Sequence, residues 1–235
     1  MVYILSIKVV SFDVWNTLLD IDKFYRIIAV KISVLTKRDF KEIYSLMREA
    51  YKEALRERLE GRFKRIIIDS ADYFAKKIGV EKDLLFRSLV KALSDEDIKD
   101  LLYDDVVETL ERLREKELKL AIIGNVMFWP GMVNRYILYR NNILDYFDVT
   151  IFSDEINVMK PDKEIFEYIA SSLNVRLDEM AHVGDSVEHD LAGAVLNGVL
   201  GILIRRDVET PILRLGSKAY LINDLRRLID LFNII

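Results

Sequence analysis

The stretch IKVVSFDVWNTLL, residues 7–19, decides the fold. Its first six residues form a mainly apolar run, which predicts a buried strand, and Asp13 stands where that run ends. Open α/β sheets bind their ligands at the carboxyl ends of strands, where an aspartate can serve as nucleophile, base or metal ligand. Asn16 tolerates a left-handed turn, and the hydroxyl of Thr17 can donate to an anion held beside Asp13. The stretch therefore predicts a ligand site at the end of the first strand.

Three later segments repeat this arrangement, because each is an apolar run that ends in polar residues. They are 118–123 followed by Asn125, 151–153 leading to Lys160, and 181–183 followed by Asp185. One aspartate after one strand is equally well explained as a helix cap or a turn residue. Four such strand ends in order favour a single site built from several strands.

The segment between Asp20 and Tyr103 shows helical spacing and no convincing strand. Apolar residues recur there at three- and four-residue steps, and glycines stand where helices are expected to end. The clearest of these patterns cover 40–61, 67–78 and 84–93. The segment is therefore predicted to be an all-helical insert.

After Tyr103 predicted helices alternate with predicted strands, which favours right-handed crossovers and a parallel sheet. The last predicted strand, 219–222, is expected at an edge of that sheet. The predicted fold is α/β, with a Rossmann-like parallel sheet core and helices on both faces, plus an all-helical domain. Residues 1–19 and 102–235 would form the core, and residues 20–101 the inserted helical domain.

The four segments together make the chain resemble the haloacid dehalogenase superfamily of phosphotransferases and hydrolases. In that family the first motif reads Asp-x-Asp-x-Thr, the second ends a strand in Ser or Thr, often followed by Asn, the third supplies Lys, and the fourth reads Gly-Asp-x-x-x-x-Asp. The matching residues here are Asp13 and Thr17, then Asn125, then Lys160, then Asp185 and Asp190. The resemblance covers residues 5–20 and 104–206, and it implies that the helical insert is a cap that closes over the active site.

The charges of these residues point to a metal ion. If the strand ends converge, Asp13, Asp185 and Asp190 face a single nearby cation, Lys160, and a hard divalent ion such as Mg²⁺ would relieve the excess. The resemblance implies the same ion. It would be held by the side chains of Asp13 and Asp185 and by the carbonyl of Trp15, with Asp190 either binding the ion directly or lying behind those ligands.

The resemblance also implies a reaction, in which Asp13 attacks phosphorus to give an aspartyl phosphate that water then hydrolyses. Thr17 and Asn125 would position the phosphoryl oxygens, and Lys160 would neutralise the charge developing on them. The favoured function is thus a Mg²⁺-dependent phosphatase that acts on a small phosphorylated metabolite. His182, inside a predicted strand, is expected to pack or hydrogen-bond there.

Two residues depart from the family pattern. Trp15 stands where the phosphatases of the family carry a second aspartate, which protonates the leaving alcohol and then activates water. General acid catalysis contributes roughly 10² to 10⁴ in rate, so alkyl phosphates are expected to react poorly. Gly124 stands where the family uses Ser or Thr, which removes one hydroxyl from the phosphate site.

These departures leave two other functions open. The 2-haloacid dehalogenases of the family carry a Tyr at the position of Trp15, and halide leaves without an acid. They work without metal, however, and lack an aspartate at the position of Asp185, whose charge would repel a haloacid carboxylate. A catalytically weakened binding or regulatory module is the other alternative, which Trp15 and Gly124 favour and the intact Asp13, Lys160 and Asp185 oppose.

Composition limits the partners and the cellular location to be expected of the protein. The 235 residues are 51% hydrophobic, enough for a large core, and a net charge of −4 without a basic block gives no reason to expect nucleic acid or an anionic membrane as partner. No apolar run approaches the roughly 20 residues of a membrane helix, and the N-terminal run is expected to be a core strand, not a signal peptide. The absence of cysteine excludes thiolate chemistry and fits a cytoplasmic location. The charged fraction of 31%, with few glycines and prolines, favours a thermophile's protein.

Overall fold

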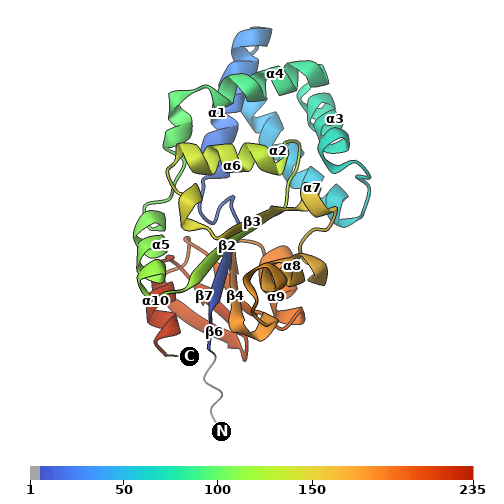
Figure 1. Ribbon diagram of the computed structural model, residues 1–235. Coiled ribbons are helices and arrows are strands. Elements are labelled where there is room, and N and C mark those ends of the chain that lie inside the picture. The colour runs from blue at the N-terminus through green and yellow to red at the C-terminus, as the bar shows by residue number, and fades with distance from the viewer. Residues whose placement is uncertain (1–5, 235) are drawn as a thin grey trace. The chain divides into compact units, whose positions relative to one another are not determined.

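In the computed structural model, which describes residues 6–234, the chain divides into two compact units (Figure 1). The first unit takes in the chain up to Leu19, then Leu102–Asn125, and the chain from Asn142 onward. The second takes in Asp20–Leu101 and Val126–Asn141. Residues 1–5 and 235, which the sequence analysis assigns to the core, lie outside the described residues.

The first unit is built on a seven-stranded sheet with the strand order β3-β2-β1-β4-β5-β7-β6. Its strands are β1 (Val9–Phe12), β2 (Lys119–Gly124), β3 (Val149–Phe152), β4 (Met180–Gly184), β5 (Leu200–Ile204), β6 (Ile212–Gly216) and β7 (Ala219–Ile222). Neighbouring strands are parallel, except that β6 runs antiparallel to β7. This arrangement confirms the predicted α/β class with a Rossmann-like, mostly parallel sheet.

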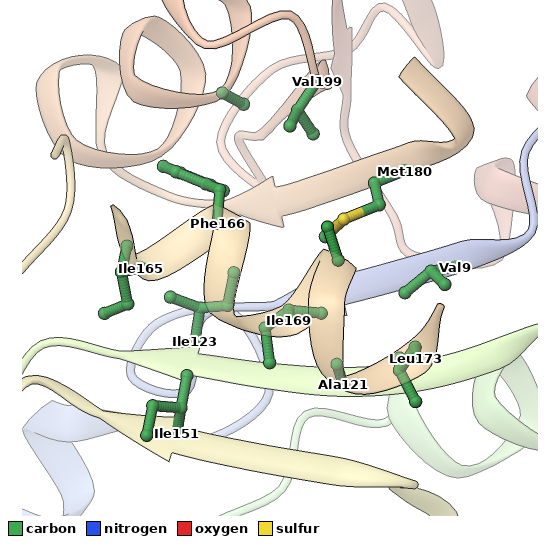
Figure 2. Close-up of a cluster of buried hydrophobic side chains, with 12 residues drawn as sticks. Val9, Ala121, Ile123, Ile151, Ile165, Phe166, Ile169, Leu173, Met180 and Val199 are labelled. Carbon is green, nitrogen blue, oxygen red and sulfur yellow. The ribbon is translucent and has the colours of Figure 1, made fainter. Parts of the chain in front are cut away.

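Helices cover both faces of the sheet, with α5 and α10 on one side and α8 and α9 on the other (Figure 1). The helices of this unit are α5 (Val106–Glu115), α7 (Ser153–Ile156), α8 (Lys163–Leu173), α9 (Gly193–Leu196) and α10 (Arg227–Phe232), and a π-helical turn spans Val187–Ala192. Apolar residues of α8 recur at helical spacing and meet the sheet in a buried cluster (Figure 2). In it, Phe166 and Ile169 lie among Val9, Ile123 and Met180, which come from β1, β2 and β4.

One prediction about the sheet is wrong. The strand Ala219–Ile222, expected at an edge, is β7, which lies between β5 and β6. The strand at that edge is β6, which is not predicted from the sequence, and β3 forms the other edge. Arg214 interrupts its short apolar run, and Leu213 and Leu215 are exposed, so one-sided burial does not constrain this strand as it does a central one.

The described residues of the second unit form helices joined by loops, with no strand among them. It contains α1 (Ile21–Thr36), α2 (Phe40–Leu59), α3 (Ile66–Ile78), α4 (Lys82–Leu93) and α6 (Gly131–Arg140). The side chain of Asp20 caps α1 by accepting from the amide of Asp22 at 2.8 Å, and Gly79 ends α3 in a left-handed conformation. None of the helices described is long and apolar enough to cross a membrane.

Residues 126–141 belong to this helical unit, whereas the sequence analysis places them with the sheet. Aromatic packing explains the difference, because Phe128 and Trp129 insert among rings from α1 and α3. The ring centroids of Phe128 and Phe74 lie 4.5 Å apart, and those of Trp129 and Phe24 lie 5.3 Å apart. Apolar periodicity along 102–141 alone does not reveal such a contact between distant segments.

Candidate active site

Three aspartates meet at the carboxyl ends of β1 and β4. Asp13 follows β1, Asp185 follows β4, and Asp190 stands in the π-helical turn just beyond. The two strands are neighbours with Phe12 opposite Val183, so the sheet register itself brings Asp13 close to Asp185. Each aspartate offers one carboxylate oxygen, and these oxygens all lie within 4.8 Å of one another.

Lys160 lies inside this cluster with its side chain 1% exposed. Its Nζ is 2.7 Å from Asp13 Oδ1 and 2.7 Å from Asp190 Oδ1. Burial acts to lower the pKa of Lys160, but the charges of the two aspartates outweigh it and the pKa is raised. The lysine is therefore charged, and it joins the aspartate after β1 to the one in the π-helical turn.

Asn125, at the end of β2, holds the backbone of Lys160. Its Nδ2 donates to the Lys160 carbonyl at 3.0 Å, and its Oδ1 accepts from the Lys160 amide at 2.9 Å. Asn125 is predicted from the sequence to position phosphoryl oxygens, whereas in the structure both ends of its amide bind the backbone of Lys160. Asn125 thus fixes the chain at the residue whose ammonium lies between Asp13 and Asp190.

Asp190 is buried, and both of its oxygens are engaged. Oδ1 contacts Lys160 Nζ at 2.7 Å and His182 Nε2 at 3.1 Å. Oδ2 accepts from the amide of Ser186 at 2.9 Å. Burial alone would raise the pKa of Asp190, but Lys160 and His182 hold it well below its usual range. Gly184 leaves room for this carboxylate, because a Cβ there would lie 2.2 Å from Asp190 Cγ. These contacts indicate that Asp190 orients the lysine.

His182 is a fully buried member of β4, as the sequence analysis expects of a structural histidine. Burial, and then the charge of Lys160, lowers its pKa, so the ring is neutral. A neutral ring protonated at Nε2 donates to Asp190 and can accept at Nδ1 from Ser11 Oγ, which lies 2.9 Å away. The histidine therefore connects the middle of β1 to the aspartate that orients Lys160.

The two remaining carboxylates carry the excess charge. Burial raises the pKa of Asp13 to about 6, with Lys160 opposing the rise, and burial together with the charge of Asp13 raises the pKa of Asp185 to about 7. Three carboxylates thus face one buried ammonium. Oxygen ligands with uncompensated negative charge are the donor set that Mg²⁺ prefers, so the residues present fit that ion.

The turn after β1 presents two further polar groups. Asn16 adopts a left-handed conformation with φ of 60°, and its Nδ2 donates to Asp185 Oδ2 at 3.1 Å. The Oγ1 of Thr17 is buried and has no hydrogen-bond partner among the described residues. Buried hydroxyls are normally paired, so this one offers a hydrogen-bond donor to a water molecule or a ligand.

Trp15, in the same turn, is 9% exposed, and its backbone forms an isolated bridge with Leu19. An indole has one N–H and no carboxyl group, so it cannot transfer a proton to a leaving alkoxide. Trp15, which departs from the family pattern, is thus a buried aromatic residue two positions after Asp13.

The departure at Gly124 has a steric cause. A Cβ on Gly124 would lie 2.5 Å from Cδ1 of the Phe152 ring, because β2 and β3 are neighbours with these residues opposite one another. The ring occupies the space that a Ser or Thr side chain would need.

We therefore expect Gly124→Ser to destabilise the protein, by about 1–3 kcal/mol, because it overpacks this contact. Phe152→Ala should itself destabilise by leaving a cavity, yet it should remove most of the cost of Gly124→Ser when the two are combined. Urea unfolding of the single and double variants measures this coupling. Additive effects of the two substitutions would show that the ring and the glycine are independent.

Arg206, which no sequence motif marks, follows β5 and contacts the same turn. Its guanidinium donates to the backbone carbonyls of Asn16 and Thr17 at 3.1 Å and 2.9 Å. No local pattern marks a contact between residues 190 positions apart in the chain. A cavity of about 400 Å³ opens beside this contact, and it is lined by Asn16, Tyr103, Asp185, Ile204, Arg205, Arg206 and Asp207.

A sequence profile of the haloacid dehalogenase-like hydrolases matches residues 7–198, which include the three aspartates and the lysine of this cluster. The chain belongs to the haloacid dehalogenase-like hydrolase family. The family resemblance read from the motifs is therefore confirmed.

Relatives of this haloacid dehalogenase-like hydrolase include phosphatases. The chain is 35% identical to the glyceraldehyde 3-phosphate phosphatase of Methanopyrus kandleri, over 44% of this chain and 43% of that protein. The matches to three such curated phosphatases span 43%, 55% and 48% of their lengths, about half in each case.

Solved structures extend the likeness to nearly the whole chain. The HAD-hydrolase YfnB of Bacillus subtilis, solved bound to magnesium, has a TM-score of 0.78 at 18% identity, covering 97% of this chain and 99% of that one. The L-2-haloacid dehalogenase of Xanthobacter autotrophicus, with chloropropionic acid covalently bound, has a TM-score of 0.72 at 19% identity, covering 97% and 98%. At these identities the likeness shows the shared fold.

Proposed function

We propose that this haloacid dehalogenase-like hydrolase is a Mg²⁺-dependent phosphatase that acts on a small phosphorylated metabolite. The observation that carries the proposal is the cluster in which one buried lysine lies between Asp13 and Asp190, so that three carboxylates share a single ammonium. The buried hydroxyl of Thr17, which has no partner within residues 6–234, supports it by offering a donor to a phosphoryl oxygen. The phosphatase names of the curated relatives point the same way.

Asp13 is the nucleophile of this proposal. One of its carboxylate oxygens forms a bond to phosphorus, the ester bond on the opposite side breaks, and the leaving oxygen departs with the electron pair. Water then attacks phosphorus, releases inorganic phosphate and regenerates the Asp13 carboxylate. Lys160 holds Asp13 in place and balances the charge that gathers on the phosphoryl oxygens, one of which accepts from Thr17.

The metal would be held by the side chains of Asp13 and Asp185 and, by the family resemblance, by the carbonyl of Trp15. Bound there, Mg²⁺ supplies positive charge to the transferring phosphoryl group. Asp190 contributes indirectly, because its oxygens are already engaged by Lys160, His182 and the Ser186 amide. The helical unit would serve as the cap of the site. For the protein as a whole, we propose a cytoplasmic location.

Trp15 favours a second candidate, a 2-haloacid dehalogenase that forms an ester on Asp13, because halide departs without a proton. Asp185 weighs against it, since its charge would repel the carboxylate of a haloacid unless a cation covered it. A module that binds phosphorylated metabolites without turnover remains the third candidate. The 2.7 Å contact between Lys160 Nζ and Asp13 Oδ1 argues against this third candidate, because it holds the proposed nucleophile in place.

The test is a panel of phosphorylated metabolites and one aryl phosphate, assayed for phosphate release with Mg²⁺ and with excess chelator, beside 2-chloropropionate assayed for chloride release. The proposal expects phosphate release that requires Mg²⁺ and is lost in Asp185→Asn. Chloride release at full rate in chelator would establish the dehalogenase instead. Binding of a metabolite without turnover would establish the binding module.

Trp15 leads to a prediction about leaving groups. Without a general acid, aryl and acyl phosphates should react, while alkyl phosphates, whose alkoxides need a proton to depart, should lag by about 10²-fold or more. Trp15→Asp should narrow that gap, provided that the new carboxyl group reaches the ester oxygen. The measurement is the ratio of kcat/KM for an aryl and an alkyl phosphate in both proteins. Equal rates in the unmodified protein would mean that another residue supplies the proton.

The raised pKa values of Asp13 and Asp185 predict how metal binding depends on pH. Both values lie above the usual 3.8, so the metal-free folded state holds extra protons, and stability from these groups is lost as pH rises through about 6 and 7. Mg²⁺ binds the deprotonated carboxylates and offsets this loss. We expect Mg²⁺ to raise Tm more at about pH 7.5 than at about pH 5.5. An equal rise at both would contradict these protonation states.

A further inference from the structure

Arg206, at the carboxyl end of β5, contacts the turn that carries the candidate nucleophile. It stands two residues beyond β5, and its guanidinium donates to the carbonyl of Asn16 through Nη1 at 3.1 Å and to the carbonyl of Thr17 through Nη2 at 2.9 Å. Fixing two successive carbonyls fixes the peptide planes on both sides of Thr17, since each peptide unit is planar. One side chain therefore sets the backbone of the turn at these two residues.

The arginine is itself held in place. Asp105, whose side chain is 6% exposed, accepts from Nη2 at 2.9 Å and also from the amide of Leu225 at 2.9 Å. The ring of Tyr103 lies against the guanidinium, with 3.9 Å between the guanidinium carbon and the ring centroid. Residues before α5 and before α10 thus fix the position of Arg206, which is a rigid support and not a loose surface side chain.

The turn that Arg206 supports contains the residue that contacts Asp185. Asn16 is left-handed with φ of 60°, a conformation that costs free energy in a residue with a Cβ and needs support from its surroundings. In this conformation Asn16 Nδ2 reaches Asp185 Oδ2 at 3.1 Å. A shift of the turn would move the Asp185 partner, the Thr17 hydroxyl and the start of the turn at Asp13 together.

We propose that Arg206 is a positioning residue, which holds the turn of residues 13–17 in the conformation that orients Asp185 and Thr17 toward a bound metal ion and phosphoryl group. The proposal rests on the proposed function for the identity of those ligands. The conformation of the turn does not depend on the proposed function. Arg206 touches no reacting atom, and it acts through two backbone carbonyls.

Arg206→Lys is the informative variant, because it keeps the charge near Asp105 but loses the planar fork that reaches two carbonyls and a carboxylate at once. Arg226→Lys is its matched control. Arg226 also pairs with carboxylates in this unit, those of Glu108 and Asp224, and donates to the Asp104 carbonyl. None of these contacts lies in residues 13–17.

Two readouts separate positioning from simple stability. Calorimetry gives the Kd of Mg²⁺ itself, and we expect Arg206→Lys to raise it about 10- to 100-fold, the usual effect of losing a residue that orients metal ligands. Trp15 fluorescence, in a Trp129→Phe background where Trp15 is the only tryptophan, reports the turn without metal or turnover. We expect acrylamide to quench Trp15 fluorescence more strongly in Arg206→Lys than in the parent protein. In Arg226→Lys the quenching should be unchanged.

Each outcome decides the proposal. A Kd and a Trp15 quenching that match the Arg226→Lys control would overturn it, even if Arg206→Lys lowered Tm. If the unmodified protein binds no Mg²⁺ and releases no phosphate, the proposed function fails, and Trp15 quenching alone then decides whether Arg206 holds the turn. Should Arg206→Lys not fold, Asp105→Asn, which loosens Arg206 without removing it, takes its place, with the same shifts expected and their absence contradicting the proposal.

Discussion

Asp13→Asn should abolish Mg²⁺-dependent phosphate release, with a loss in rate of about 10⁴-fold or more, while the protein stays folded. The reason is chemical, because an amide oxygen does not displace a phosphate ester, and its neutral group is also a poor ligand for Mg²⁺. Phosphate release from an aryl phosphate under saturating Mg²⁺ measures the loss. Asp13→Glu keeps the charge but moves the carboxylate by one methylene, and we expect it to be nearly as inactive.

The Tm of Asp13→Asn distinguishes a loss of chemistry from a loss of folding. Asp13 adds negative charge to a buried cluster that already holds more carboxylates than cations, and Lys160 keeps Asp190 as its partner when Asp13 is neutralised. The Tm of metal-free Asp13→Asn at about pH 7.5 should therefore equal or exceed that of the unmodified protein. A lower Tm, or residual activity within tenfold of the unmodified protein, would contradict the assigned role.

Lys160→Met should have the largest effect on stability. The lysine is buried between Asp13 and Asp190, and its removal leaves both carboxylates without their cation, which costs about 3–5 kcal/mol when one partner of a buried ion pair is lost. The loss should shrink as pH falls, because the stranded carboxylates then take up protons. Urea unfolding at about pH 7.5 and pH 5.5 measures both effects, and phosphate release should be lost as well.

Lys163→Met is the matched control, three residues further along the chain. Lys163 is exposed, and its partner Glu167 lies one turn along α8, so its removal should leave the free energy of unfolding almost unchanged. If the two variants lost the same stability, or if the loss in Lys160→Met did not depend on pH, then Lys160 would not be the cation that balances the cluster.

Much of the sheet and of the candidate site follows from the sequence, because both depend on local signals. Apolar runs that end in Asp13 and Asp185 identify strands whose carboxyl ends meet, and parallel pairing then brings the two aspartates together. Lys160 lies where its motif predicts, beside Asp13. Burial of these strands on both faces makes their apolar runs continuous, which is why the signal is strong.

The contacts between distant segments could not be predicted in this way. Arg206 reaches the turn of Asn16, and the Phe152 ring fills the space beside Gly124, through tertiary packing that leaves no periodic trace in the sequence. Asn125 shows a subtler limit. Its position after β2 is predicted, but its partner, the backbone of Lys160, is set by how two loops meet.

The central claim is that Asp13 becomes phosphorylated, and rapid acid quenching of the protein during its reaction with an aryl phosphate and Mg²⁺ tests it most directly. With Trp15 in place of the residue that would activate water, hydrolysis of the intermediate should be slow, so the intermediate should accumulate. Mass spectrometry of the peptide that contains Asp13 should show one added phosphoryl group, absent in chelator and in Asp13→Asn. Steady Mg²⁺-dependent phosphate release with no phosphoryl group on that peptide at any time point would contradict the account.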